Sequence, residues 1–144
     1  MTFDPGLMIA GHQGAFFFED GTPMGDCRSF EVTIGFETTD ERVMGEDTVY
    51  ASEQGHTYEL RFTRLHIDDN LPTQLLGNIR QGRRTVLSFM GEIHRPDGAV
   101  GQYIMAMAVP TGTHRLVGME PGTTSTREHT WRLNRRPEIQ QALP

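Results

Sequence analysis

The side chains most able to do chemistry are six histidines and a single cysteine. His66-Ile67-Asp68-Asp69 offers an imidazole and two carboxylates, which are common metal ligands. The group lies at a predicted strand-to-helix junction, however, where carboxylates cap helices, and no other histidine has a spacing that completes a site. Glu92 and His94 share one face of a predicted strand before a turn, which favours a solvated hairpin end. The pattern predicts no metal.

Nucleophile and phosphate motifs are equally weak. Cys27 has no identifiable base nearby in the sequence, so we interpret it as a small core residue. As the only cysteine, it excludes an intrachain disulfide and a thiolate cluster. Gly11-x-x-Gly14 is too short to indicate phosphate binding, and we find no nucleophile elbow, P-loop or dinucleotide fingerprint. The sequence predicts no catalytic residue and no cofactor, so we expect that the protein is not an enzyme.

The charge pattern argues against specific nucleic-acid or membrane binding. The formal net charge is −6, with acidic residues spread along the chain. Two arginine groups lack the interleaved aromatic residues of a nucleic-acid platform: Arg80, Arg83 and Arg84, which complement the end of a predicted helix, and Arg132, Arg135 and Arg136. No apolar stretch approaches the ~20 residues of a spanning helix, and Met1–Ala10 lacks signal-peptide features. We expect a soluble protein that is assembled where it is made.

Short strands dominate the predicted structure of one domain, residues 1–144. A length of 144 residues, 16 glycines and a hydrophobic fraction of 36% suit many strands and tight turns. Period-two alternation is clearest in Ser29–Glu37 and Thr57–Thr63. Weaker strands are predicted at Ala15–Phe18, Thr85–Ile93, Gly101–Val109, Arg115–Gly118 and Thr126–Asn134. Asp20-Gly21 and Pro96-Asp97-Gly98 are hairpin signals.

One short helix is predicted between these strands. Asp69 or Asn70 can cap its start, and Gly82 can end it. Leu71, Leu75 and Ile79 form a narrow apolar stripe, which favours packing on the sheet.

A long polar segment, Thr38–Gly55, separates the two clearest strands, and we interpret it as a loop. Loops of this length are uncommon in compact domains unless they have a function. Its apolar exceptions, Val43, Met44, Val49 and Tyr50, suit docking on another protein, whereas the alternative is a merely mobile loop.

The order of these features resembles the tail tube proteins of contractile-tailed phages and phage-like particles. The resemblance begins with Ile9-Ala10-Gly11-His12-Gln13-Gly14, then Phe16-Phe17-Phe18-Glu19-Asp20-Gly21 and Met24. It continues through Ser29-Phe30-Glu31-Val32, Val43-Met44-Gly45, Gly55–Phe62, and the helix with Gly82 ahead of Thr85–Met90. It covers the chain from about Ile9 to Asn134. Two departures are His129–Asn134, where the family often has an acidic aromatic strand, and one extra residue before the first Asp-Gly turn.

The resemblance implies a mainly β fold, a β-sandwich or partial barrel with one short α-helix, that contributes strands to a multi-subunit β-barrel. Such subunits close into hexameric rings that stack into a hollow tail tube, through which DNA passes into the host. The implied partners are copies of the chain itself and the sheath, baseplate or initiator, and terminator proteins. DNA is a partner only in transit, and no membrane is involved. The implied location is the virion tail, after assembly in the host bacterial cytoplasm.

The resemblance also assigns surfaces. Residues 1–10 form an N-terminal arm, and Thr38–Gly55 reaches a neighbouring subunit or ring through Val43, Met44, Val49 and Tyr50. The polar faces of the two clearest strands become candidates for the channel wall; the alternative is an ordinary solvated face. These candidate lumen residues are Glu31, Thr33, Glu37, Glu59 and Arg61.

Two other functions remain open from the sequence. A lipocalin-like small barrel would bind or convert a hydrophobic molecule in a pocket lined by Phe16, Phe18, Tyr103, Met105, Met107 and Trp131. The inner tube of a contractile injection system or phage-tail-like bacteriocin would have the same architecture and carry no DNA.

Overall fold

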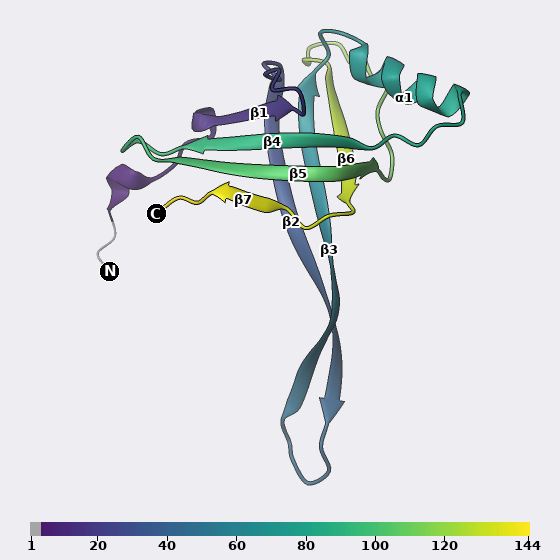
Figure 1. Cartoon of the computed structure of the whole chain (residues 1–144). Coiled ribbons are helices and arrows are strands. Elements are labelled where there is room, and N and C mark those ends of the chain that lie inside the picture. Colours follow the sequence, from purple (N-terminus) through teal and green to yellow (C-terminus); the bar gives the residue numbers. More distant parts are fainter. Residues whose placement is uncertain (1–3) are drawn as a thin grey trace.

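The computed structural model describes residues 4–144 and contains seven strands and one α-helix (Figure 1). All strand pairs are antiparallel, in the order β1-β4-β5-β6-β3-β2, with β7 added beside β5. The mainly β fold with one short helix is therefore confirmed. In chain order the elements are the 3-10 helices η1 (Pro5–Leu7) and η2 (Gly11–Gln13), β1 (Gly14–Phe18), β2 (Cys27–Arg42), β3 (Val49–Leu65), α1 (Asn70–Arg80), β4 (Leu87–His94), β5 (Val100–Pro110), β6 (Thr126–Leu133) and β7 (Glu138–Gln141).

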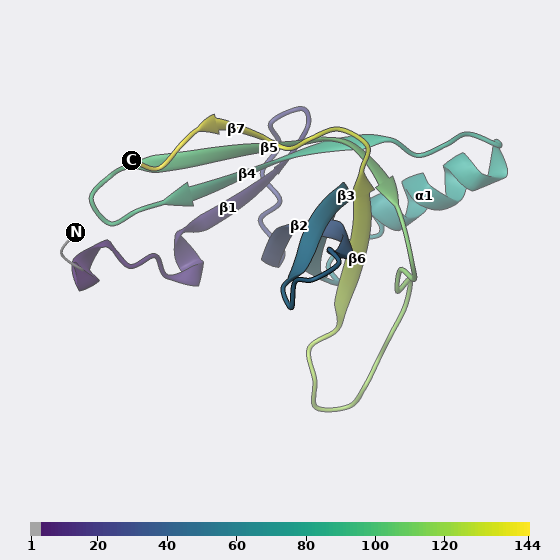
Figure 2. The ribbon, with the colours of Figure 1, turned by 90° about the horizontal axis from the view of Figure 1, so that it is seen from below.

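The sheet bends so that its two halves cross. Figures 1 and 2 show β1, β4, β5 and β7 running across β2, β3 and β6. The bend lies in β5, which pairs with β4 over most of its length but with β6 only at Ala108–Pro110. Met107 forms a bulge at this corner with a φ of 56°, and its carbonyl accepts from the backbone N–H of Asn134 at 3.0 Å. Bulges bend strands in this way, and the result is the predicted partial barrel.

Aromatic side chains fill the space between the two halves. Phe16 of β1 lies 5.2 Å from Phe62 of β3, Phe62 lies 5.3 Å from Phe89 of β4, and Phe89 lies 5.4 Å from Trp131 of β6, between ring centroids. All four side chains are buried. Each of these side chains points inward from its strand. Because successive side chains of a strand point to opposite faces, the alternation of apolar and polar residues in the sequence indicates this core.

One face of the helix α1 packs on this core. Leu71 and Leu75 are buried as predicted, but Ile79 is 73% exposed, because the helix extends past the sheet. Asp69 occupies the N-cap position as predicted but makes no side-chain capping bond; the backbone N–H of Asn70 donates instead to Asp68 Oδ1 at 3.1 Å. Gly82 ends the helix with a φ of 69°, as its residue type predicts.

The prediction that Thr38–Gly55 is a loop is wrong. β2 and β3 continue through it as a hairpin that pairs Thr38 with Glu53 and Arg42 with Val49, after a bulge between Glu37 and Thr38. Only residues 43–48 form the turn. Period-two alternation arises when one face of a strand is buried. This part of the hairpin has both faces in water, so its sequence does not alternate.

Two further elements differ from the prediction. Arg115–Gly118 is not a strand; side chains hold its backbone, through Arg127 Nε to the carbonyl of Leu116 at 2.9 Å and Ser125 Oγ to the carbonyl of Gly118 at 2.8 Å. The strand β7 was not predicted, because its four residues are all exposed.

The turn at Pro96-Asp97-Gly98 is confirmed between β4 and β5, with Arg95 N–H donating to the Ala99 carbonyl at 2.8 Å. The turn at Asp20-Gly21 is also present, with Gly21 at a φ of 84°. Residues 4–10 of the predicted N-terminal arm are exposed and include η1, while residues 1–3 lie outside the described part.

A histidine pair, the buried His129 and the half-buried His114, lies against the core. His114 Nε2–H donates to the Thr130 carbonyl at 2.9 Å, so His114 Nδ1 accepts from His129 Nδ1–H at 3.0 Å. Burial, and to a smaller extent electrostatic repulsion from His114, Arg64 and Arg127, lowers the pKa of His129 from 6.5 to about 4. A second proton on His129, at Nε2, would place a positive charge on a ring that is 1% exposed. The native protein therefore keeps His129 neutral.

We expect the free energy of unfolding to decrease as the pH falls from about 6.5 to about 4. In this window the unfolded chain binds a proton at His129 and the native protein does not, so acid favours unfolding. Below the lower value both states are protonated and this contribution stays constant. The loss should be roughly 3 kcal/mol, measured by urea denaturation across a pH series.

Substitution of His129 by Gln should flatten this pH dependence. The matched control is His94→Gln, because the His94 side chain is 50% exposed and should leave the slope unchanged. Equal slopes for wild type and His129→Gln would contradict the assignment.

Candidate assembly surfaces

The two ends of the sheet, β1 and β2, are not joined to each other within residues 4–144. The free side of β1 is partly covered, because Met24 N–H donates to the Phe16 carbonyl at 2.8 Å and Phe18 N–H to the Thr22 carbonyl at 3.0 Å. The outer side of β2 has no strand partner along its 16 residues. Such an edge is a template for pairing with another chain.

The β2–β3 ribbon projects far from the body (Figure 1). Of the apolar residues assigned to subunit contact, Val43 is 52% exposed and Met44 is fully exposed, and Val49 and Tyr50 are also exposed. The Tyr50 hydroxyl donates to Glu46 Oε2 at 2.5 Å, which raises the pKa of Tyr50. A two-stranded ribbon without a packed face is marginally stable alone. The role of the ribbon in subunit contact stays a prediction. The exposure of these apolar residues is compatible with it.

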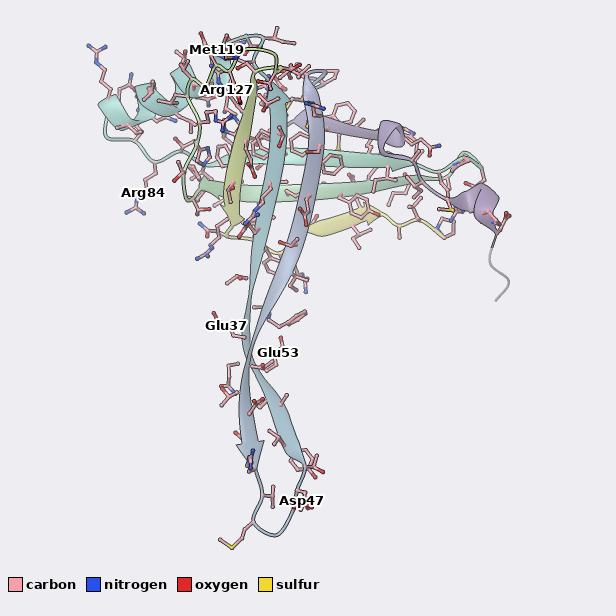
Figure 3. All side chains as sticks on the ribbon, turned by 180° about the vertical axis from the view of Figure 1, so that it is seen from behind. Glu37, Asp47, Glu53, Arg84, Met119 and Arg127 are labelled. Carbon is pink, nitrogen blue, oxygen red and sulfur yellow. The ribbon has the colours of Figure 1, made fainter. Side chains whose placement is uncertain are left out.

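Most of the protein's net charge lies on this ribbon. Residues 37–53 contain six acidic residues and one arginine, a net −5 of the chain's −6. Figure 3 shows Glu37 and Glu53 midway along the ribbon and Asp47 at its turn. The carboxylates raise its solubility in isolation and favour a cationic partner surface.

Four of the five candidate lumen residues come together on one polar face. Glu31 pairs in register with Arg61 and Thr33 with Glu59, and the four line one shallow depression. Arg61 Nε donates to Glu59 Oε1 at 2.5 Å, and this bond raises the pKa of Arg61. The fifth, Glu37, stands apart, farther out on the ribbon (Figure 3).

Sequence reasoning missed the part of this face that β6 supplies. Arg132 is opposite Glu59, Thr130 is opposite Arg61, and Glu128 is opposite Thr63. The alternation of buried and outward residues in Thr126–Leu133 was the signal that could have found them. The three strands together display Glu31, Glu59 and Glu128 with Arg61 and Arg132.

The residues considered for metal chemistry belong to a structural network. The buried Arg127 donates through Nη1 to the Asp68 carbonyl at 2.6 Å and through Nη2 to a carboxylate oxygen of Asp69. His66 Nε2 lies 2.7 Å from the same Nη2. Arg127, then His66, lowers the pKa of Asp69. This network fixes the start of α1 against the 111–125 loop, which Arg127 also binds at the Leu116 carbonyl.

The remaining residues considered for chemistry are Cys27, Glu92 and His94. Cys27 is half-buried, its thiol lies 3.3 Å from the Ser29 carbonyl, and burial raises the pKa of Cys27 to about 11. His94 Nε2 lies 3.3 Å from Glu92 Oε2 at the hairpin end. Within residues 4–144 we find no group of three or more side chains arranged for a metal ion.

The residues proposed for a lipocalin-like pocket do not enclose one. Phe16, Met105 and Trp131 are packed in the core, Phe18 and Tyr103 pack against it, and Met107 faces outward. A groove of about 480 Å³ lies near the unjoined β1 and β2 edges; of the six proposed residues only Phe16 lines it, with residues that include Ile9, Phe30 and Ile93.

Both arginine groups are exposed. Arg80, Arg83 and Arg84 surround the end of α1, and Arg132, Arg135 and Arg136 follow the end of β6. None of the six forms an ion pair among residues 4–144. In the same part of the chain, no helix has the length and apolarity needed to span a membrane.

Comparison with known proteins identifies the fold. No protein-family model and no curated protein matches the sequence. A chain in the cryo-EM structure of the anti-feeding prophage cap, a tube terminating cap, matches with a TM-score of 0.71 at 15% identity, over 99% of this chain and 95% of that chain.

Two other assemblies contain similar chains. One from the sheath-tube complex of the extracellular contractile injection system PVC, in the extended state, has a TM-score of 0.64 at 13% identity, over 92% of each chain. One from the virion of a native gene transfer agent has a TM-score of 0.54 at 11% identity, over 92% of this chain and 99% of that chain. The chain has a tail-tube-like fold, as its sequence motifs indicated.

Substitution of Arg127 by Leu should lower the free energy of unfolding by about 3 kcal/mol, because it leaves the carbonyls of Asp68 and Leu116 without their donor. Urea denaturation measures the loss. Arg132→Leu is the matched control on the same strand; it is exposed and should change stability by less than about 0.5 kcal/mol. Similar losses for both variants would show that Arg127 does not hold this region.

Proposed function

We propose that this protein is the building block of a tail tube. Its copies close into hexameric rings, and the rings stack into a hollow tube through which DNA passes into the host. The observation that carries the proposal is the unpartnered 16-residue strand β2, which continues into an exposed ribbon with an apolar tip. The tail-tube-like fold supports it.

Ring closure follows from pairing between copies. A strand edge that binds a different surface of the next copy makes a head-to-tail contact, which closes into a ring when the rotation per subunit allows it. The edge of β2 then completes its hydrogen bonds with a neighbour instead of with water. The strands β2, β3 and β6 of each copy become part of a barrel shared by the whole ring.

The polar face of these strands then lines the channel. Glu31, Thr33, Glu59 and Arg61 lie on the side of β2 and β3 opposite to the buried Leu60 and Phe62. Glu37 extends this face toward the next ring. A wall in which carboxylates outnumber guanidinium groups has few sites that hold phosphate, so DNA slides through.

The proposed partners are other copies and the sheath, baseplate or initiator, and terminator proteins of a virion tail that assembles in the host bacterial cytoplasm. The names of the similar structures, which include a baseplate and a sheath-tube complex, support this setting. The proposed role is structural and involves no catalysis.

A second candidate is the inner tube of a contractile injection system or a phage-tail-like bacteriocin, which carries no DNA. The matches to the anti-feeding prophage and to PVC favour it. Particles purified from producing cells separate the two candidates, because nuclease-protected DNA is present only in the first.

Shortening the ribbon should prevent assembly and leave the fold intact. We would replace residues 43–48 by Asn-Gly, a two-residue turn suited to a hairpin. The turn makes no core contact, so the variant should show the thermal unfolding of the wild type. Negative-stain microscopy of concentrated protein should show tubes for the wild type and none for the variant. Normal tubes from the variant would rule out a contact role for the tip.

The channel wall is tested by a cryo-EM reconstruction of the tubes. We expect Glu31, Thr33, Glu59 and Arg61 on the inner surface and α1 on the outer surface. A reconstruction with those four side chains on the outside, beneath a sheath, would overturn the assignment.

A further inference from the structure

The distribution of charge divides the molecule into two parts. The ribbon carries a net −5 in residues 37–53, while the rest of the chain has a net charge of −1. That remainder bears eight exposed arginines without an ion pair among residues 4–144: Arg28, Arg115 and the six that form the two groups. Opposite charges on separate surfaces of one chain attract between copies, and like charges repel.

The acidic part and one arginine group occupy opposite ends of the molecule. Figure 1 shows α1 at the end remote from the turn of the ribbon, and Figure 3 places Asp47 at the turn and Met119 at the other end, with Arg84 beside α1. A contact between opposite ends repeats from copy to copy without closing, and so builds a linear stack.

Apolar exposure distinguishes between the two arginine groups. The acidic tip, which we define as Val43, Met44, Glu46 and Asp47, includes the fully exposed Met44. The helix-end surface, which we define as Leu76, Ile79, Arg80, Arg83, Arg84 and Val86, includes Ile79 at 73% exposure. Both surfaces therefore combine charge with apolar area that a partner can cover.

The other arginine group does not match the tip in this way. Arg132, Arg135 and Arg136 line a small pocket with His56, Tyr58 and Asn134, at the base of the ribbon itself. This group has no exposed large apolar side chain beside it in that pocket.

The helix-end surface belongs to a rigid part of the fold. Leu71 and Leu75 anchor α1 in the core, and Asn78 Nδ2 donates to the buried Thr85 Oγ1 at 2.9 Å, which holds the arginine-bearing turn to the helix. A preorganised surface loses little freedom when it binds.

We propose that the acidic tip of one copy docks on the helix-end surface of a second copy in the next ring. Glu46 and Asp47 face Arg80, Arg83 and Arg84, and Met44 covers Ile79. The ion pairs select this end over the other arginine group and set how successive rings align. The inference rests on the proposed tube and adds the surface that receives the ribbon.

Charge reversal tests the pairing. The tip variant is Glu46→Lys with Asp47→Lys, and the helix-end variant is Arg83→Glu with Arg84→Glu. The combined variant carries all four changes and keeps the net charge of the wild type. The matched control, Arg135→Glu with Arg136→Glu, makes the same charge change in the other group. All these side chains are exposed, so circular dichroism should give unchanged thermal unfolding for every variant.

The readout is the critical concentration for tube assembly, from sedimentation and negative-stain microscopy. Each reversal alone should raise it ~10-fold or more, and the combined variant should return it close to the wild-type value. The control should assemble like the wild type. Added salt should weaken wild-type assembly.

Three results would overturn the inference while the proposed function stands: wild-type tubes with normal assembly of the helix-end variant, no rescue in the combined variant, or an equal defect in the control. A wild-type chain that forms no ring or tube at any concentration would contradict the proposed function itself.

Discussion

The crossing of the two sheet halves is the constraint on which the rest of the structure depends. The contact between Phe16, Phe62, Phe89 and Trp131 occupies one end of the long hairpin and forms the centre of the buried core. The bulge at Met107 makes the crossing possible, because β5 can serve both halves only by turning a corner. Everything beyond that core extends into water. A hairpin that extends beyond its packed length presents a strand edge and side chains that another chain can cover, and the proposed assembly uses this surface.

The charged residues are divided between the same two parts, the packed body and the exposed ribbon. The ribbon is the least packed part of the chain and carries nearly all of the net negative charge, while exposed arginines without partners lie on the body. In the isolated molecule these groups are hydrated and contribute little to stability. Between copies they attract, and their positions at opposite ends favour stacking over closed dimers. The wall of the proposed channel uses a different mixture, in which Arg61 is paired with Glu59, and Glu31, Glu59 and Glu128 outnumber Arg61 and Arg132.

Buried polar groups hold the loops and strand ends of the fold in place. Arg127 links the start of α1 to the 111–125 loop. Arg64 forms four nitrogen–oxygen contacts with Asp26, at 2.9–3.1 Å, near the start of β2. The His114–His129 pair joins β6 to the same loop. Pairing of this kind offsets the free-energy cost of burying charged and polar side chains. It also holds the loop in one of many possible arrangements. The side chains that suggested chemistry in the sequence are the ones that the fold uses for this purpose.

The sequence by itself determined the fold class, the helix, the turn at Pro96-Asp97-Gly98 and most inward-facing residues of the core strands, because burial of one face leaves an alternating pattern that a reader can detect. The opening motifs, which resemble those of tail tube proteins, were also readable from the sequence alone. It could not show that Thr38–Gly55 is a ribbon, since a hairpin with both faces in water has no alternation and its order comes from backbone pairing alone. It could not place β7, because its four residues are exposed and form a strand only by pairing with the edge of β5. It could not show that Arg132 lies beside Glu59, since residues so distant in the chain meet only through the order of strands in the sheet. Local side-chain patterns record burial, whereas strand pairing and the joining of distant surfaces arise only when the whole chain folds.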